Sequence, residues 1–331
     1  MPSGNNLKDR IRPVYHRLKK RKDILLYGNC AVLLYHRVID IPTDPQLLAV
    51  SPGHFSDHLS IIKNEFHPLT VEEFTHYLIK GKKFPKNSVL ITFDDGYADN
   101  HLFARPILES KGLQGLFYIS TGYIGKKVEY WWDELERLLL INTKLPEEYN
   151  FEPEDYKFHF SKSDISSIYR FYSQLLERFK KVNSIRREEL MNLLRIEIPH
   201  DDVRKSHLPM SLDELKSFSR SSSVVLGAHT LLHPSLSSCS NEEIKREVLG
   251  SKSDLESWTG NPIPFFSYPF GTGADFDDRT IRVISPMGFS HVAGNYPGIV
   301  HARSPRTHFP RFLVRNWNGN DFRTRLTQFL I

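Results

Sequence analysis

The stretch Ser88–Gly96 reads SVLITFDDG, and the interpretation of the whole chain starts from it. Its first six residues, Ser88–Phe93, form a short apolar run that predicts a buried strand. The run stops at two adjacent carboxylates, Asp94 and Asp95. Burying two like charges side by side is costly unless a cation or a proton is shared between them. The pair therefore indicates either a charged functional site or two aspartates that cap a loop before Gly96.

Similar short apolar runs recur along the chain, and most of them stop at polar or reactive residues. The further strands that we predict are 31–35, 116–120, 224–228, 265–268 and 312–314. Helical patterns lie between most of them, with start signals at Ser51-Pro52, Thr70/Glu73 and Ser240/Glu243. This alternation is typical of an α/β fold with a parallel sheet or barrel, in which active sites lie at the carboxyl ends of the strands.

One long segment, at about residues 129–215, breaks this alternation. It is rich in Glu, Lys, Arg, Ser and aromatic residues, and residues 163–181 and 184–195 have the pattern of amphipathic helices. We predict a helical insertion on a barrel domain of residues 29–331, rather than a separate domain.

The basic charge of the chain is concentrated in a leader, residues 1–28. The net charge is +5, but residues 1–22 alone carry eight basic side chains and one acidic one, so the rest of the chain is slightly acidic. A leader of this kind either docks on an anionic lipid surface or is a solvated terminus. The near-neutral remainder argues against a nucleic-acid-binding protein.

Composition and cysteine usage are those of an ordinary soluble enzyme, with 40% hydrophobic and 25% charged residues. No apolar stretch approaches the length of a membrane span, and the N-terminus lacks the apolar region of a secretory signal. Cys30 and Cys239 form neither a disulfide framework nor a CxxC metal pair, and we interpret both as buried thiols. We expect a cytoplasmic protein, in peripheral contact with a membrane if the leader docks there.

Two histidines follow the predicted strand at 224–228. His229 and His233 lie four residues apart in GAHTLLHP (227–234), a spacing that places two imidazoles on one face of a helical turn. Such a pair is often incidental by itself. One aspartate and two histidines at strand ends, however, give three ligands and leave coordination positions open, as a catalytic zinc requires.

Three of these stretches together resemble the polysaccharide deacetylase family, also called the NodB-homology domain or carbohydrate esterase family four. TFDDG (92–96) matches its first motif, HTLLH (229–233) its second, and FSYPFG (266–271) resembles its third. The resemblance covers about residues 30–125 and 223–320. It implies a distorted (β/α) barrel of about seven strands and an enzyme that removes acetyl groups from N-acetylated sugars of a polysaccharide or glycan precursor.

The resemblance also implies roles for individual residues. Asp95, His229 and His233 would hold Zn²⁺ or another divalent transition metal. Asp94 would be the general base for the attacking water, and the backbone N–H near Phe270 would stabilise the oxyanion. Tyr268, from the same motif, joins Phe270 in the predicted substrate-binding set.

Two departures from the family pattern affect further roles. In many members, a histidine on a Leu-x-His strand near the C-terminus gives the proton to the leaving amine. We do not find that strand near the C-terminus of this sequence. Residues 33–36 (LLYH) instead look like the same strand moved to the front, as in the exopolysaccharide-associated branch. His36 would then be the general acid, unless it is a histidine at the end of a strand. Ser267 stands where many members have an arginine that orients the base, and Arg311 could substitute for it.

Aromatic residues offer candidate sugar contacts. Trp131 and Trp132 either stack on sugar rings or pack within a helix, and Tyr97 is the candidate nearest to the metal for lining the groove. The partner that we expect is therefore an N-acetylated glycan. Two alternatives to this function remain open, a carbohydrate-binding barrel with weak or no turnover and an O-deacetylase acting on ester-linked acetyl groups.

Overall fold

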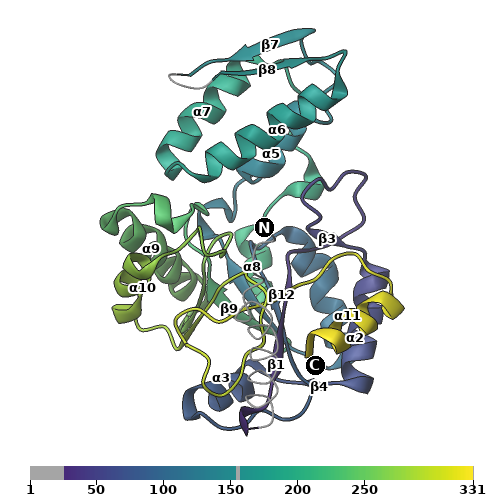
Figure 1. Ribbon diagram of the computed structural model, residues 1–331, viewed down its shortest axis with the longest axis vertical. Coiled ribbons are helices and arrows are strands. Elements are labelled where there is room, and N and C mark those ends of the chain that lie inside the picture. Colours follow the sequence, from purple (N-terminus) through teal and green to yellow (C-terminus); the bar gives the residue numbers. More distant parts are fainter. Residues whose placement is uncertain (1–25, 154–156, 331) are drawn as a thin grey trace, which may run out of the picture.

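The computed structural model describes residues 26–153 and 157–330, and its centre is a curled parallel sheet (Figure 1). The strand order is β11 (His291–Ala293), β10 (Phe265–Ser267), β9 (Val224–Ala228), β6 (Gly115–Ile119), β5 (Ser88–Phe93), β1 (Cys30–Tyr35) and β12 (Phe312–Leu313), and β4 (His67–Pro68) also pairs with β5. Every pairing in this sheet is parallel. The seven strands of the main order form a curled half-barrel with helices around it, which confirms the predicted distorted (β/α) barrel.

The segment that precedes β12 connects the two ends of the sheet. The Gly294 N–H, just after β11, donates to the Phe309 carbonyl, and the Arg311 N–H donates to the Tyr296 carbonyl. The chain then crosses to β1, where Leu34 pairs with Leu313. Strands from the beginning and the end of the chain are therefore neighbours.

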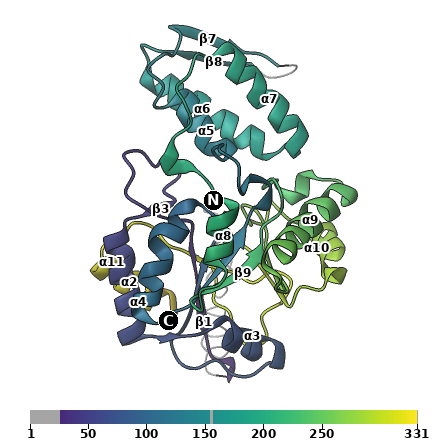
Figure 2. The same ribbon diagram turned by 180° about the vertical axis from the view of Figure 1, so that it is seen from behind.

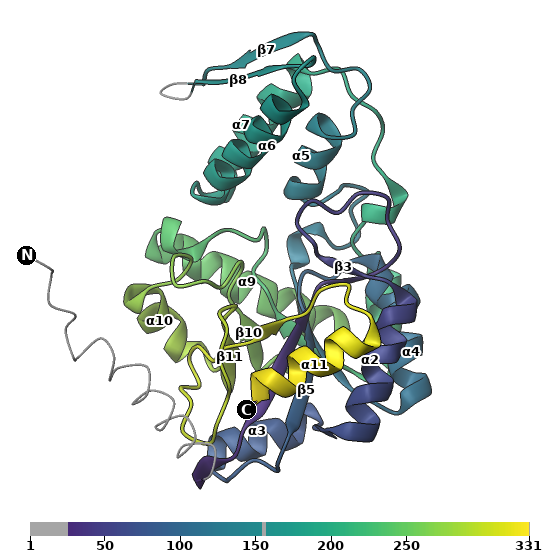
Figure 3. The ribbon, with the colours of Figure 1, turned by 45° about the vertical axis from the view of Figure 1, so that its right-hand side comes forward.

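Helices cover the outside of the sheet (Figures 2 and 3). They are α2 (Pro52–Glu65), α3 (Val71–Lys80), α4 (Arg105–Lys111), α8 (Leu212–Phe218), α9 (Asn241–Thr259), α10 (Asp278–Ile284) and α11 (Gly319–Leu330). The predicted start signals of three of them are confirmed: Ser51 caps α2, and complete capping boxes begin α3 at Thr70 and α9 at Ser240. A buried apolar cluster between the sheet and these helices forms the core.

The insertion stands over one end of the barrel (Figure 1). It contains α5 (Trp131–Leu139), β7 (Glu148–Phe151), β8 (Phe158–Ser161), α6 (Ile165–Lys180) and α7 (Ser184–Glu197). These elements have an apolar cluster of their own, which includes Leu135, Phe171 and Leu190. The antiparallel β7–β8 hairpin was not part of the sequence prediction, which expected helices alone.

The leader lies almost wholly outside the described residues, so its contact with lipid stays a prediction. Within 26–153 and 157–330, no helix combines the length and the apolar character that crossing a membrane requires. Cys30 and Cys239 are free and buried, as predicted.

Candidate metal centre and active site

The three predicted metal ligands meet at the carboxyl ends of β5 and β9, the two strands on either side of β6. Asp95 follows β5, and His229 follows β9. His233 Nε2 lies 3.4 Å from Asp95 Oδ1, and His229 Nε2 lies 3.6 Å from the same oxygen. All three side chains are buried, and their ligand atoms lie within 4.8 Å of one another.

The two histidines are brought together by a loop, and the predicted helical turn is wrong. Residues 229–235 contain no helix. Thr230 and His233 instead adopt left-handed backbone conformations, with φ of 67° and 53°, and the His233 N–H donates to Thr230 Oγ1 at 3.0 Å. A spacing of four residues is compatible with either geometry, so it could not distinguish a turn of helix from this loop.

The chemistry of this group fits a divalent metal. His229 Nδ1 donates to the Ser267 carbonyl at 2.8 Å, which leaves the Nε2 lone pair facing the carboxylates with no hydrogen-bond partner among the described residues. A metal-binding histidine is held in this way by its other nitrogen. Burial and the charges of Asp94 and Asp133 raise the pKa of Asp95 well above its usual range. A cation bound beside Asp95 would offset these effects and favour its ionised form.

Asp94 is held by a buried arginine. Arg311 Nη1 donates to Asp94 Oδ1 and Nη2 donates to Oδ2, both at 2.7 Å, a bidentate pair. The remaining donors of the guanidinium reach the Gly294 carbonyl at 2.6 Å and Ser267 Oγ at 2.7 Å. The arrangement is the one expected of an arginine that orients the base, with Ser267 as part of its support.

The charge of Asp94 is set by opposing effects. Burial raises the pKa of its carboxyl, but Arg311 and His229 lower it, so the net pKa is below the ordinary value. Asp94 is consequently ionised at neutral pH. Its Oδ2 lies 3.7 Å from His229 Nε2, so it borders the metal group without belonging to it.

A cavity of about 220 Å³ opens onto Asp94, Asp95 and His233. Its other lining residues are His36, Gln46, Leu48, Trp132, Lys180, Phe270, Thr272, Asn295, Leu313 and Arg315. The structure therefore places His36, Trp132 and Phe270 where sequence reasoning expected them. Lys180 and Arg315 also line the cavity, and sequence reasoning missed both.

Three predicted substrate contacts lie behind the cavity wall. Tyr97 is fully buried, and Trp131 and Tyr268 are 3% and 1% exposed; none of the three lines the cavity. Tyr268 stacks on Phe276, and its hydroxyl donates to the Thr307 carbonyl. All three residues pack in the protein interior, which for Trp131 is the alternative that the sequence left open.

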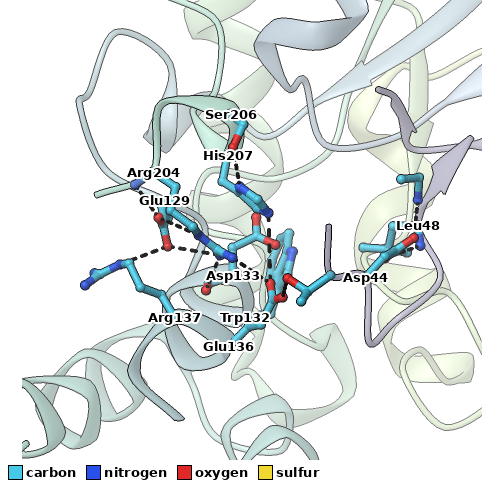
Figure 4. Close-up of polar contacts among 12 residues, drawn as sticks. Asp44, Leu48, Glu129, Trp132, Asp133, Glu136, Arg137, Arg204, Ser206 and His207 are labelled. Atoms are coloured by element: carbon cyan, nitrogen blue, oxygen red, sulfur yellow. Dashed lines mark hydrogen bonds and ion pairs between the residues drawn. The ribbon is translucent and has the colours of Figure 1, made fainter. Parts of the chain in front are cut away.

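Tyr97 supports the cavity indirectly. Trp132 Nε1 donates to the Tyr97 hydroxyl at 2.8 Å, and that hydroxyl donates to Asp133 Oδ2 at 2.7 Å. Figure 4 shows Trp132 and Asp133 in the polar cluster at the base of the insertion. This chain of hydrogen bonds fixes the orientation of the one predicted tryptophan that lines the cavity.

The same cluster contains a second group with metal-ligating atoms. Asp133, Glu136 and His207 offer buried donors within 4.8 Å of one another. A guanidinium already provides the positive charge there, because Arg204 contacts Glu136 at 3.1 Å and Glu129 at 3.1 Å (Figure 4). We therefore interpret this group as a buried ion-pair network within the insertion, and hydrogen bonds from Tyr97 to Asp133 and from Thr43 to Glu136 connect it to the barrel.

Unusual backbone conformations concentrate at the metal centre. Asp95, Thr230, His233 and Phe270 all have positive φ, at 80°, 67°, 53° and 57°. Such conformations are uncommon for residues other than glycine, and they persist where the surrounding structure enforces them, often at functional sites.

The ligand loop is held by two charged residues that sequence reasoning missed. Glu247 of α9 accepts the N–H groups of Leu231 and Leu232 at 3.1 and 2.8 Å. Arg187 of α7 donates to the carbonyls of Leu232 and His233. The insertion therefore helps to position a metal ligand. No local motif marks either residue, since both act across long separations in the sequence.

His36 lines the cavity beside these groups, and its charge state matters for its role. Burial lowers the pKa of its imidazole to about 3; Asp94 opposes this, while Arg311 and Arg315 add to it. His36 is therefore neutral at neutral pH before a substrate binds.

Fold and site define a (β/α) barrel with a candidate metal centre of one aspartate and two histidines at the carboxyl ends of its strands. The polysaccharide deacetylase family model matches residues 81–140 and 203–292, the parts that carry this centre. This match confirms the predicted resemblance to the polysaccharide deacetylase family.

Curated relatives match over limited regions. YxkH of Bacillus subtilis, assigned to the polysaccharide deacetylases, is 33% identical over 97 residues, covering 29% of this chain and 33% of its own length. A poly-β-1,6-N-acetyl-D-glucosamine N-deacetylase of Staphylococcus aureus is 36% identical over 80 residues, covering 24% and 27%. These alignments span about a third or less of the relatives' lengths.

Solved structures resemble the whole fold. The deacetylase PplD of Streptococcus pyogenes, solved in complex with acetate, aligns with a TM-score of 0.60 over 92% of this chain and 99% of its own, at 17% identity. IcaB from Ammonifex degensii aligns with a TM-score of 0.57 over 92% and 97%, also at 17% identity. At such identity these likenesses establish the fold.

Proposed function

We propose that this protein is a metal-dependent hydrolase that removes acetyl groups from N-acetylated sugars of a polysaccharide or glycan precursor. Asp95, His229 and His233 hold the metal, and Zn²⁺ suits one carboxylate and two imidazoles with open positions. When bound, such an ion would polarise the acetamide carbonyl and lower the pKa of a coordinated water to about 7. The resemblance to the polysaccharide deacetylase family and the N-deacetylase activity for which the Staphylococcus aureus relative is named support this proposal.

One observation carries the proposal. The ionised carboxylate of Asp94, which pairs with the buried Arg311, lies next to the three buried residues with metal-ligating atoms, and a cavity opens onto this group. A carbohydrate-binding barrel without turnover has no need of such a base. Asp94 takes the proton of the attacking water, and Arg311 keeps both carboxylate oxygens in place while it does so.

The leaving amine needs a proton, and His36 supplies it. Because the imidazole is neutral at the start, it takes one proton from solvent as negative charge develops on the substrate. It donates this proton to the amine nitrogen as the C–N bond breaks, and the proton that Asp94 took from the water is later released to solvent. The backbone N–H near Phe270 donates to the oxyanion, a contribution of about 2.7–4 kcal/mol for such donors. Trp132 offers its ring to the sugar.

Acetate release tests the proposal. The purified protein should release acetate from a panel of N-acetylated glucosamine oligomers, lose this activity with a chelator and regain it with Zn²⁺. A matched panel of O-acetylated sugars distinguishes an esterase from an amidase. Turnover of the esters alone would reassign the protein to the O-deacetylases, and sugar binding without turnover of either panel would favour a binding barrel.

A further inference from the structure

One cation on the cavity wall, Arg315, forms no ion pair with a carboxylate of the described residues. Arg315 follows β12 and lines the cavity. Its Nη1 donates to the carbonyls of Gln46 and Leu47. In the two described ranges, no carboxylate lies within 4.0 Å of its guanidinium nitrogens, and no acceptor contacts its Nε or Nη2.

The nearby carboxylates already have other partners. Asp94 binds Arg311 through both oxygens, and Asp95 lies against the two histidines. Asp44 accepts from the N–H groups of Leu48 and Ala49 at 2.9 and 2.8 Å, and Figure 4 shows its contact with Leu48. None of them is free to neutralise Arg315.

Lys180 is the other cation on the cavity wall, and it differs in this respect. Its Nζ lies 3.0 Å from Asp275 Oδ1 and 4.6 Å from the centre of the Phe270 ring. The charge of Lys180 is therefore matched within the protein. Burial lowers the pKa of Arg315, and Asp44 offsets this only in part, as expected for a half-buried cation that lacks a partner.

Strand register places Arg315 beside the proposed proton donor. Leu34 pairs with Leu313, and the Val314 N–H donates to the Leu34 carbonyl. His36 and Arg315 follow the ends of these two strands at matching positions, the charge of Arg315 acts on His36, and both residues line the cavity. A group bound by Arg315 would lie on the side of the cavity where the amine leaves.

We propose that Arg315 binds an anionic group, a phosphate or a carboxylate, that the glycan carries close to the acetamide. The substrate class is then an anionic N-acetylated glycan rather than a neutral polymer. This inference rests on the proposed deacetylase function and names the substrate of that same site. A guanidinium recognises either anion through paired, charge-assisted hydrogen bonds, which a neutral sugar cannot replace.

The test compares three substrates that share one N-acetylglucosamine disaccharide: the neutral sugar, its phosphate monoester and its analogue with a neighbouring uronic acid. The kcat/KM ratio of each anionic sugar to the neutral one is measured in the wild type and in Arg315→Gln. We expect at least one anionic sugar to be favoured by about tenfold or more in the wild type, and the kcat/KM ratio to fall to about one in Arg315→Gln. The favoured anion identifies the source of the charge.

Two controls keep the result interpretable. Arg323→Gln removes an exposed arginine that does not line the cavity and should keep the preference, whereas Arg315→Lys should keep part of it. Because each ratio is internal to one variant, a general loss of stability cancels. Equal use of neutral and anionic sugars by the wild type, or an unchanged preference in Arg315→Gln, would overturn the inference while leaving the deacetylase function intact.

Binding gives a readout that does not depend on turnover. If none of the sugars is hydrolysed, the proposed function fails, and calorimetric titration of the same sugars still decides the role of Arg315. Tighter binding of an anionic sugar that Arg315→Gln abolishes supports the inference, and equal binding of all three sugars contradicts it.

Discussion

Replacing Arg311 by methionine should destabilise the protein far more than the loss of one surface charge. The substitution removes both 2.7 Å contacts to Asp94 and leaves a carboxylate that is only 3% exposed without its partner. Breaking a buried ion pair from one side typically costs about 3–5 kcal/mol, because the remaining charge is uncompensated. We expect a loss of this size at neutral pH, measured by denaturant unfolding of the metal-free protein.

The double variant Asp94→Asn/Arg311→Met tests the cause. It has no buried carboxylate to compensate, so it should recover part of the loss, with a coupling free energy of about 2–3 kcal/mol. Arg323→Met, at an exposed arginine paired with Glu65, is the matched control and should change stability little.

The pH dependence gives a second check on the same variant. In the wild type the pKa of Asp94 is lowered, so its contribution to stability is present above the unfolded pKa of about 3.9 and is lost as pH falls through the lower folded pKa. Without Arg311, burial raises that pKa instead, so the deficit of Arg311→Met should be largest at neutral pH and shrink in acid. Additive single effects, or a deficit that does not depend on pH, would refute this reasoning.

Four further predictions concern individual residues. His233→Ala should lose both metal and activity, whereas His291→Ala, at a buried histidine outside the centre, should keep its metal by elemental analysis; equal metal in both would contradict the ligand assignment. Asp94→Asn should retain metal while kcat falls by about 10²–10⁴-fold, and loss of metal in this variant would make Asp94 a ligand. His36→Ala should reduce hydrolysis of a sugar amide by about 10²-fold or more but that of an activated aryl ester much less, and equal losses would remove its role as proton donor. Burial raises the pKa of Asp133 to about 7, so Asp133→Asn should gain thermal stability relative to the wild type as pH rises from about 4 to 7; a constant difference in Tm would contradict that pKa.

The sequence predicts the strands that have clear boundaries and misses those that do not. The apolar runs that became β1, β5 and β9 are five or six residues long and almost wholly buried, so their pattern is unambiguous. The sequence did not predict β11, which has only three residues and pairs with β10. The β7–β8 hairpin packs on α6 inside the insertion, and it alternates too weakly to predict a strand pair.

The residues of the candidate site also divide into those that the sequence predicts and those that it misses. Asp95 and His229 were found because each lies within two residues of the end of a strand, and parallel strands bring their carboxyl ends together. Arg187, Glu247 and Arg315 were missed because their roles depend on tertiary contacts that no local spacing encodes. Tyr97 was placed near the right site, but sequence could not show that its hydroxyl points to Asp133 behind the wall.

Titration of metal-free protein with Zn²⁺, with acetate release from an N-acetylglucosamine oligomer measured at each addition, tests the central claim most directly. One centre made by Asp95, His229 and His233 predicts that activity starts near zero, rises in proportion to added metal and reaches its plateau at about one equivalent per chain. Full activity in the metal-free protein, or release of acetate that Zn²⁺ does not change, would contradict it.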